Sequence, residues 1–209
     1  EKYLLKIRPF FYFDIIKVIT GIRRCGKSFI LKAIINELLE KGVCQEQIIY
    51  IPLDRRGYKN IRTPELLEAK IESSIKEDGF YYIFIDEVQN APRWPLFVNR
   101  LLRQGLHLIL TGSNANLLSD ELITHLTGRY NEIRLFPFSF EEYCRINNID
   151  IQGQHTKAIG LRGYALSKYL NEGGFPETMN STLDKTEYTK ALLDTIIQKD
   201  ICKRYKVRY

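Results

Sequence analysis

The spacing of two glycines, a lysine and a serine near the N-terminus constrains this chain more than any other feature. Residues 21–28 read Gly-Ile-Arg-Arg-Cys-Gly-Lys-Ser, which satisfies the phosphate-loop pattern G-x-x-x-x-G-K-[ST]. An apolar stretch at residues 15–20 precedes the loop, and an amphipathic pattern follows it from Lys27. Glycine allows backbone angles that wrap N–H groups around a phosphate, and a helix directs its partially positive N-terminus at the same anion. The pattern therefore predicts a nucleoside-triphosphate site between a strand and a helix.

The loop residues have separate expected roles toward ATP and Mg²⁺. Lys27 is predicted to reach the β and γ phosphates and to assist catalysis, and Ser28 is predicted to ligate Mg²⁺. Arg23 and Arg24 are unusual in such a loop; they either touch phosphate or are solvated, and we favour the second. The predicted nucleotide-binding residues are Gly21, Ile22, Arg23, Arg24, Cys25, Gly26, Lys27 and Ser28.

Two adjacent acids end an apolar segment, Ile83-Phe84-Ile85-Asp86-Glu87. Ligands of open α/β sheets bind at the carboxyl ends of strands, where these acids would lie. Asp86 is predicted to hold Mg²⁺, and Glu87 is predicted to polarise the attacking water as a general base. The alternative is a strand that simply ends at a charged turn.

Two later segments supply further candidates for catalysis. In Thr111-Gly112-Ser113-Asn114, either Ser113 or Asn114 could sense the γ-phosphate or orient water, and the alternative is a helix N-cap. In Leu126-Thr127-Gly128-Arg129-Tyr130, Arg129 could act as an arginine finger, in cis or in trans. A structural salt bridge is the alternative for Arg129.

The alternation of apolar segments with helical patterns predicts an α/β fold with a parallel sheet covered on both faces. A capping box of Ser139 and Glu142 then opens a region of helical patterns, interrupted at residues 173–176. We therefore expect an α/β domain at residues 1–138 and a helical domain at 139–209. The expected strands are 15–20, 48–53, 80–85, 107–110 and 132–136, and the expected helices of the first domain are 27–42, 64–76 and 96–103.

Composition narrows the function classes. The four cysteines form no C-x-x-C pair and the three histidines are isolated, so we expect no zinc site. Free cysteines favour a reducing, cytoplasmic environment. The sequence contains no run of 18 apolar residues, so we expect no transmembrane helix. Its first residues do not show the pattern of a signal peptide. The net charge of +6 is concentrated in residues 199–209, which read either as a DNA-contacting tail or as an amphipathic helix with a solvated basic face.

Several segments together resemble one family, the bacterial and archaeal AAA+-type ATPases that carry a C-terminal nuclease-like domain of unknown function. The resemblance implies a P-loop NTPase with a parallel five-stranded sheet flanked by helices, and a small helical lid domain at residues 139–209 that leads to the C-terminal domain, which is missing here. It also implies Lys27, Ser28, Asp86 and Glu87 as the nucleotide and Mg²⁺ machinery. The matching segments are residues 21–28, 84–89, 111–115, 127–130, 136–140, 173–177 and 199–201.

Three functions fit these residues to different degrees. The favoured one is an ATPase that hydrolyses ATP with Mg²⁺ to drive or switch action on a macromolecule. DNA is a candidate target, and a homo-oligomer is a candidate assembly. A small-molecule kinase shares the phosphate loop but needs no water-activating Glu87 beside Asp86. A binding module or switch with little intrinsic hydrolysis is the remaining alternative, because hydrolysis also requires correct positioning.

Overall fold

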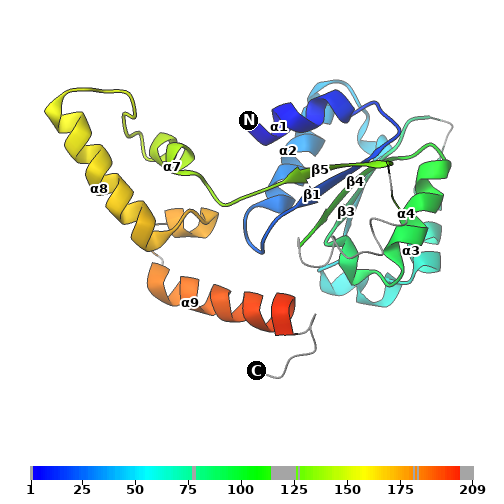
Figure 1. The fold of residues 1–209 in the computed structure, drawn as a ribbon. Helices are drawn as coiled ribbons and strands as arrows, with labels where there is room; N and C mark the ends of the chain where they lie inside the picture. The colour runs from blue at the N-terminus through cyan, green and yellow to red at the C-terminus, as the bar shows by residue number, and fades with distance from the viewer. Residues whose placement is uncertain are drawn as a thin grey trace. The chain divides into compact units, whose positions relative to one another are not determined.

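Five parallel strands form the sheet that carries the predicted site. The computed structural model describes residues 2–76, 79–113, 126, 128–180, 182 and 184–202. The strand order is β2-β3-β4-β1-β5, and every neighbouring pair is parallel (Figure 1). This confirms the predicted α/β fold with a parallel five-stranded sheet. The strands are β1 (Ile16–Thr20), β2 (Ile48–Pro52), β3 (Tyr82–Asp86), β4 (His107–Gly112) and β5 (Tyr130–Arg134).

The strand bounds differ from the predicted ones by up to two residues. β3 begins at Tyr82, whereas the predicted strand began at Phe80, whose apolar side chain is exposed. β5 begins at Tyr130 and ends at Arg134, whereas the apolar pattern suggested residues 132–136. Phe136 is exposed beyond the end of β5. Hydrophobic pattern alone misplaced these ends, because ladder pairing with the neighbouring strand decides where a strand stops.

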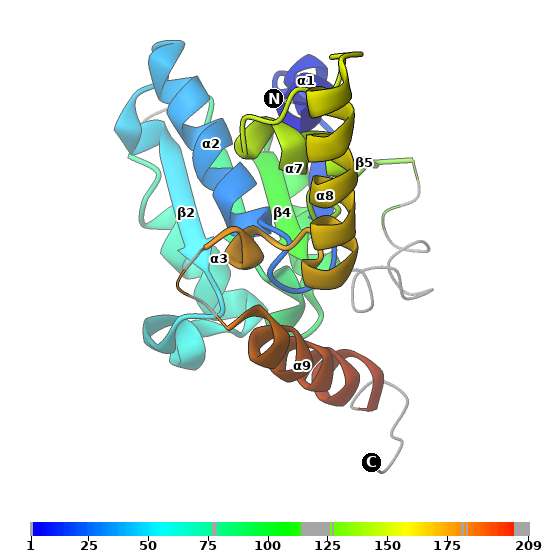
Figure 2. The same ribbon diagram turned by 90° about the vertical axis from the view of Figure 1, so that its left-hand side faces the viewer.

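Helices cover both faces of this sheet, which explains why its strands are apolar throughout. Figure 1 shows α1 and α2 on one side of the sheet and α3 and α4 on the other, and Figure 2 looks onto α2. Leu31, Ile34 and Leu38 of α2 are fully buried, at the helical spacing seen in the sequence. The four helices are α1 (Lys2–Ile7), α2 (Lys27–Glu40), α3 (Pro64–Glu72) and α4 (Trp94–Arg103), with short 3₁₀ turns η1 (Arg8–Phe10), η2 (Gln45–Gln47), η3 (Arg56–Ile61) and η4 (Val88–Asn90).

The start of α3 was predicted only in part. Pro64 stands in the first turn, as expected. Thr63 has the extended backbone of an N-cap residue, but its hydroxyl makes no capping hydrogen bond. The helix ends at Glu72, earlier than the predicted end near residue 76. The hydroxyls of Ser73 and Ser74 both donate hydrogen bonds to the carbonyl oxygen of Lys70. Such local hydrogen bonds compete with helix continuation.

The chain divides into two compact units, Glu1–Gly21 with Lys27–Leu135 and Ile22–Gly26 with Phe136–Tyr209. The second unit contains α7 (Phe140–Ile146), α8 (Thr156–Glu172), η5 (Pro176–Met179), α9 (Lys185–Ile196) and a π-helix, η6 (Ile197–Cys202). The capping box of Ser139 and Glu142 is present, as predicted. Among the described residues, no helix is long and apolar enough to cross a membrane. A lid role for residues 139–209 stays a prediction.

A small aromatic core holds α7 against α8 within the second unit. Tyr143, Cys144 and Ala165 are buried, and the ring of Tyr169 packs edge-on against that of Tyr143. Gly174 approaches this core closely, because its carbonyl accepts the N–H of Phe138 at 2.7 Å. A Cβ atom at Gly174 would lie 2.2 Å from the carbonyl oxygen of Phe138.

We therefore expect Gly174→Ala to destabilise the protein by about 2 kcal/mol, since the added methyl must displace backbone. Gly163→Ala is the matched control, because a Cβ atom there meets nothing within 4 Å. In the interior of α8 that change should stabilise by up to about 1 kcal/mol. Urea unfolding of both variants measures the difference, and equal stabilities would contradict the close approach.

A buried lysine, Lys17, is the second residue of strand β1. The Lys17 side chain is fully buried, and its Nζ donates to the carbonyl oxygen of Phe13 at 2.7 Å. Burial lowers the pKa of Lys17 to about 8, against the opposing effect of the Asp14 carboxylate. The folded chain therefore releases this proton at lower pH than the unfolded chain does.

This shift predicts how stability depends on pH. Between pH 8 and 10 the unfolded chain binds more protons at Lys17 than the folded chain, so stability rises with pH in that window. We expect the free energy of unfolding of the wild type to rise by about 2 kcal/mol relative to Lys17→Met across the window. Urea unfolding at each pH measures it. Lys32→Met, at an exposed position of α2, should follow the wild type.

Candidate nucleotide-binding site

The predicted phosphate loop directly follows β1, which lies between β4 and β5 in the sheet, and leads into α2. Gly26 has φ 103°, which side chains with a Cβ rarely adopt, so glycine is required there. Arg24 has φ 60°, a left-handed conformation that costs a non-glycine residue about 1–2 kcal/mol. A loop that keeps such a residue is held by contacts elsewhere, since strain persists only where the surroundings over-determine it.

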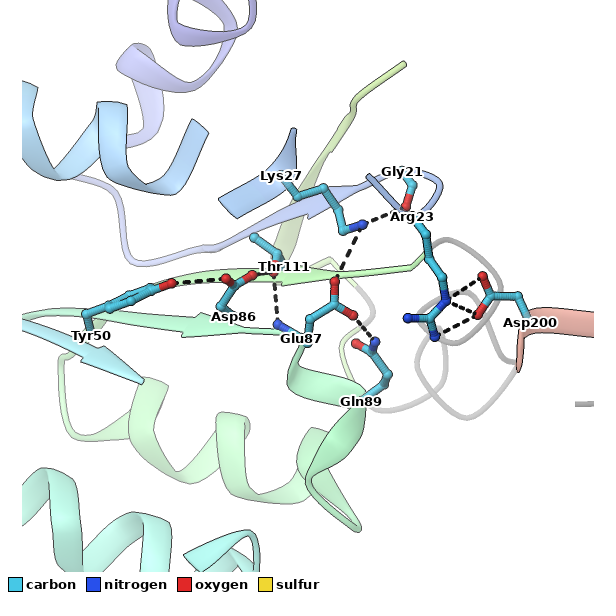
Figure 3. Close-up of polar contacts among 9 residues, drawn as sticks. All are labelled: Gly21, Arg23, Lys27, Tyr50, Asp86, Glu87, Gln89, Thr111 and Asp200. Atoms are coloured by element: carbon cyan, nitrogen blue, oxygen red, sulfur yellow. Dashed lines mark hydrogen bonds and ion pairs between the residues drawn. The ribbon is translucent and has the colours of Figure 1, made fainter. Parts of the chain in front are cut away.

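Lys27 is buried at the start of α2, with its ammonium group between the loop and the acids of β3. Its Nζ donates to the carbonyl oxygen of Gly21 at 3.1 Å and lies 3.6 Å from Oε1 of Glu87 (Figure 3). Lys27 and Glu87 lie 60 positions apart in the chain, and the sheet brings them together. Ser28, the next residue, is exposed in the first turn of α2.

Asp86 ends β3 with its carboxylate buried and held on both oxygens. The hydroxyl of Tyr50, from β2, donates to Oδ2 at 3.0 Å, and the hydroxyl of Thr111, from β4, donates to Oδ1 (Figure 3). Burial, together with the neighbouring carboxylate, raises the pKa of Tyr50, so its hydroxyl stays a donor. The two strands that flank β3 therefore orient the carboxylate from opposite sides.

Glu87 follows in a left-handed backbone conformation, φ 57°. Its N–H donates to the hydroxyl oxygen of Thr111 at 3.0 Å, so one hydroxyl is bonded to both acids. Its carboxylate lies beside Lys27 and accepts a hydrogen bond from the side-chain amide of Gln89 (Figure 3). The left-handed turn thus directs Glu87 away from the strand path and toward the loop lysine.

The donor set suits Mg²⁺ bound together with a nucleotide. Mg²⁺ usually takes one or two protein oxygen ligands and completes its shell with phosphate oxygens and water. Asp86 supplies an oriented carboxylate, and Ser28 supplies a hydroxyl at the start of α2. Across the part of the chain that the structure describes, no group of three or more His, Cys, Asp or Glu side chains is arranged to hold a metal ion.

The remaining predicted residues are not all brought to this edge of the sheet. Ser113 follows β4 and is buried, and Asn114 lies outside the described residues. The carbonyl of Arg129 accepts the N–H of Ile16, at the start of β1. The phosphate loop begins at the other end of β1, about 16 Å away. A finger role for Arg129 stays a prediction, and it would have to act on the nucleotide of a neighbouring copy.

Both loop arginines contact protein groups, which the sequence did not predict, and Arg24 is also exposed to solvent. The guanidinium of Arg23 forms an ion pair with Asp200 of η6 (Figure 3). The guanidinium of Arg24 lies over the ring of Tyr188 on α9, 5.4 Å from its centroid. Residues 22–26 accordingly group with the C-terminal helices, and the sequence could not show this because the partners lie more than 160 positions away.

Sequence reasoning also missed the polar residues around the two acids. Thr111 belongs to a segment that was predicted to be functional, but only Ser113 and Asn114 were named as candidates because they follow the strand. Tyr50 looked like an ordinary strand residue. The only available signal for either was a polar group near the carboxyl end of a strand, and its meaning depends on which strands are neighbours.

Comparison with known proteins agrees with this geometry. Residues 14–144, more than half of the chain, match the family described as "AAA domain". The chain belongs to the AAA domain family. The match begins just before β1 and ends within α7, so it includes the phosphate loop and both acids.

Two relatives align with all or most of this chain in sequence. This AAA domain is 34% identical to an uncharacterized protein of Haemophilus influenzae over 214 residues, covering 100% of this chain and 51% of that protein. It is 36% identical to the uncharacterized protein MJ1544 of Methanocaldococcus jannaschii over 200 residues, covering 92% of this chain and 43% of the relative. The chain therefore spans about half the length of these relatives.

A solved structure shares the fold at low sequence identity. The Aeropyrum pernix ORC1 protein, solved in complex with DNA, aligns with a TM-score of 0.51 and 15% identity, covering 98% of this chain and 60% of that one. At this identity the likeness concerns the fold alone.

The double role of the Thr111 hydroxyl makes a testable prediction. Thr111→Val should destabilise the AAA domain by about 2 kcal/mol, because it leaves Oδ1 of Asp86 and the N–H of Glu87 without their buried partner. Thr111→Ser keeps the hydroxyl and should lose less than half of that. Thermal and urea unfolding measure both, and equal losses would indicate that the methyl group, not the hydroxyl, stabilises this edge.

Proposed function

We propose that this AAA domain binds ATP with Mg²⁺ and hydrolyses it. The arrangement of Lys27, Asp86 and Glu87 carries the proposal, because three charged groups from two segments meet beside the phosphate loop (Figure 3). A carboxylate pair alone could end any strand. A buried lysine held between the loop carbonyl of Gly21 and the second acid is an arrangement suited to phosphate chemistry.

Each side chain then has a defined part in the reaction. The loop N–H groups and Lys27 bind the β and γ phosphates, and Lys27 stabilises the negative charge that develops between them. Glu87 accepts a proton from water as the water oxygen bonds to the γ-phosphorus. The bond from that phosphorus to the β–γ bridging oxygen breaks, and the electron pair leaves with ADP. Mg²⁺, bound through Asp86 and Ser28, would neutralise phosphate charge.

The contacts of Glu87 suggest how the reaction is prepared. Lys27 and Gln89 both engage its carboxylate in the described structure. ATP would compete for the Lys27 ammonium group, since phosphate oxygens carry more charge than one carboxylate. Gln89 would then remain as the hydrogen-bond donor that orients the general base toward water.

We further propose that hydrolysis drives or switches action on a macromolecule, with DNA the first to test. The basic residues between 199 and 208 favour a polyanion, although residues 203–209 lie outside those described. The Aeropyrum pernix ORC1 protein, which shares the fold, was solved in complex with DNA. The greater length of the relatives leaves room for a target-binding domain, as the family resemblance implies. The alternative is an ATP-dependent switch with little hydrolysis of its own.

Steady-state ATP turnover with Mg²⁺, with and without duplex DNA, tests the proposal. We expect Lys27→Ala to abolish turnover and to weaken ATP binding, because it removes the phosphate contact. Glu87→Gln should lower turnover at least 100-fold while ATP still binds, because it removes only the proton acceptor.

The possible outcomes distinguish an ATP-hydrolysing enzyme from an ATP-dependent switch with little hydrolysis. Tight ATP binding without turnover in the wild type would favour the switch, and stimulation by DNA would make nucleic acid the target. Absence of nucleotide binding would refute the proposal. Lys32→Ala, at an exposed position of the same helix, is the control for the loss of a lysine and should leave turnover unchanged.

A further inference from the structure

The ion pair between the phosphate loop and the C-terminal helix is unusually well formed. Nε of Arg23 lies 3.0 Å from both carboxylate oxygens of Asp200, and Nη2 lies 3.0 Å from Oδ1 (Figure 3). The side chain of Asp200 is only 8% exposed and that of Arg23 is 27% exposed. A planar guanidinium held by both oxygens of a buried carboxylate restricts the direction of the arginine as well as its position.

The neighbouring arginine is held by the same part of the chain. The guanidinium of Arg24 lies over the ring of Tyr188, at a distance typical of a cation–π contact. Arg24 is also the loop residue with a left-handed backbone, φ 60°. Two consecutive loop residues, one of them strained, therefore both contact the segment from Tyr188 to Asp200.

The π-helix explains how two residues twelve positions apart can serve one loop. In an uninterrupted α-helix, Asp200 would point about 120° away from Tyr188 around the helix axis. The helix changes from α to π at Ile197, and a π-helix turns through a smaller angle per residue. The change brings Asp200 nearer to the face that carries Tyr188. π-helical segments are rare in proteins, and those that occur are often found at functional sites.

We infer that Asp200 and Tyr188 are positioning residues for the phosphate loop, which they hold in its nucleotide-binding conformation through Arg23 and Arg24. The inference rests on the proposed ATP binding. A loop that is already ordered loses less freedom when phosphate binds, so the anchor strengthens nucleotide affinity. The C-terminal segment thereby influences affinity without touching nucleotide.

The competing reading makes the opposite prediction. If Arg23 were a phosphate ligand that Asp200 withholds, removal of the Asp200 charge would release it and tighten ATP binding. Loss of a negative charge beside a phosphate site would tighten binding by general electrostatics as well. A weaker affinity in Asp200→Asn is therefore specific to the anchoring role.

Isothermal titration with ATP and with ADP, and steady-state turnover, test the inference on the 209-residue chain. We expect Asp200→Asn to raise Kd for both nucleotides and KM for ATP by about fivefold or more, with kcat within about twofold of the wild type. Asp200→Glu, which keeps the carboxylate, should recover most of the affinity. Tyr188→Leu should also raise Kd, and this variant provides the test if Asp200→Asn fails to fold.

A double-mutant comparison shows whether the two charges act together. Arg23→Gln combined with Asp200→Asn should be no weaker in ATP binding than the poorer single variant, because either change removes the same pair. Additive losses, unchanged affinity or tighter binding in Asp200→Asn would overturn the inference. Glu141→Gln is the control, because it removes an exposed ion pair with Arg145 in the same unit and should leave Kd unchanged.

Hydrogen exchange without nucleotide separates this inference from the proposed function. Amides of residues 22–26 should exchange faster in Asp200→Asn than in the wild type or in Glu141→Gln, because the anchor is lost. Equal exchange would overturn the inference even if ATP binds. If the wild type fails to bind nucleotide, the proposed function fails, and the exchange data still decide whether Asp200 orders the loop.

Discussion

The hydrogen bonds around Asp86 join three neighbouring strands at their carboxyl ends, and the rest of the site depends on them. A buried carboxylate is costly unless its oxygens are satisfied, and here Tyr50 from β2 and Thr111 from β4 satisfy one oxygen each. Thr111 also accepts the N–H of Glu87. The position of both acids is therefore fixed by hydrogen bonds within the sheet, and sites built on strands are more precise than sites built on loops.

Parallel topology determines what these acids face. β4 lies between β3 and β1, so the loop after β1 opens at the same edge as the acids after β3. Lys27 can then contact Glu87 from the first turn of α2. The same topology places Arg129 at the opposite edge, because it precedes a strand that runs parallel to β1. The loop lysine and the two acids thus lie at one edge of the sheet, and the candidate arginine Arg129 lies at the other.

The second unit adds a long-range constraint to a local motif. The phosphate loop is usually described by its own sequence, yet residues 22–26 group with the C-terminal helices. Arg23 and Arg24 connect the phosphate loop to α9 and η6. A movement of the C-terminal segment would therefore also displace the phosphate loop. The two relatives are about twice as long as this chain.

The sequence by itself determined the fold class, the five strands with the helices α2, α3 and α4 that follow three of them, and the positions of the phosphate loop and the two acids. It could do so because these depend on local patterns, namely apolar strands, helical spacing, the capping box at Ser139 and glycine at a left-handed position such as Gly26. Only the tertiary structure decided that Tyr50 and Thr111 orient Asp86, that Asp200 binds Arg23, and that Arg129 lies far from the loop. Those contacts join residues 25 to 177 positions apart or depend on strand order, and no local pattern encodes which strands become neighbours.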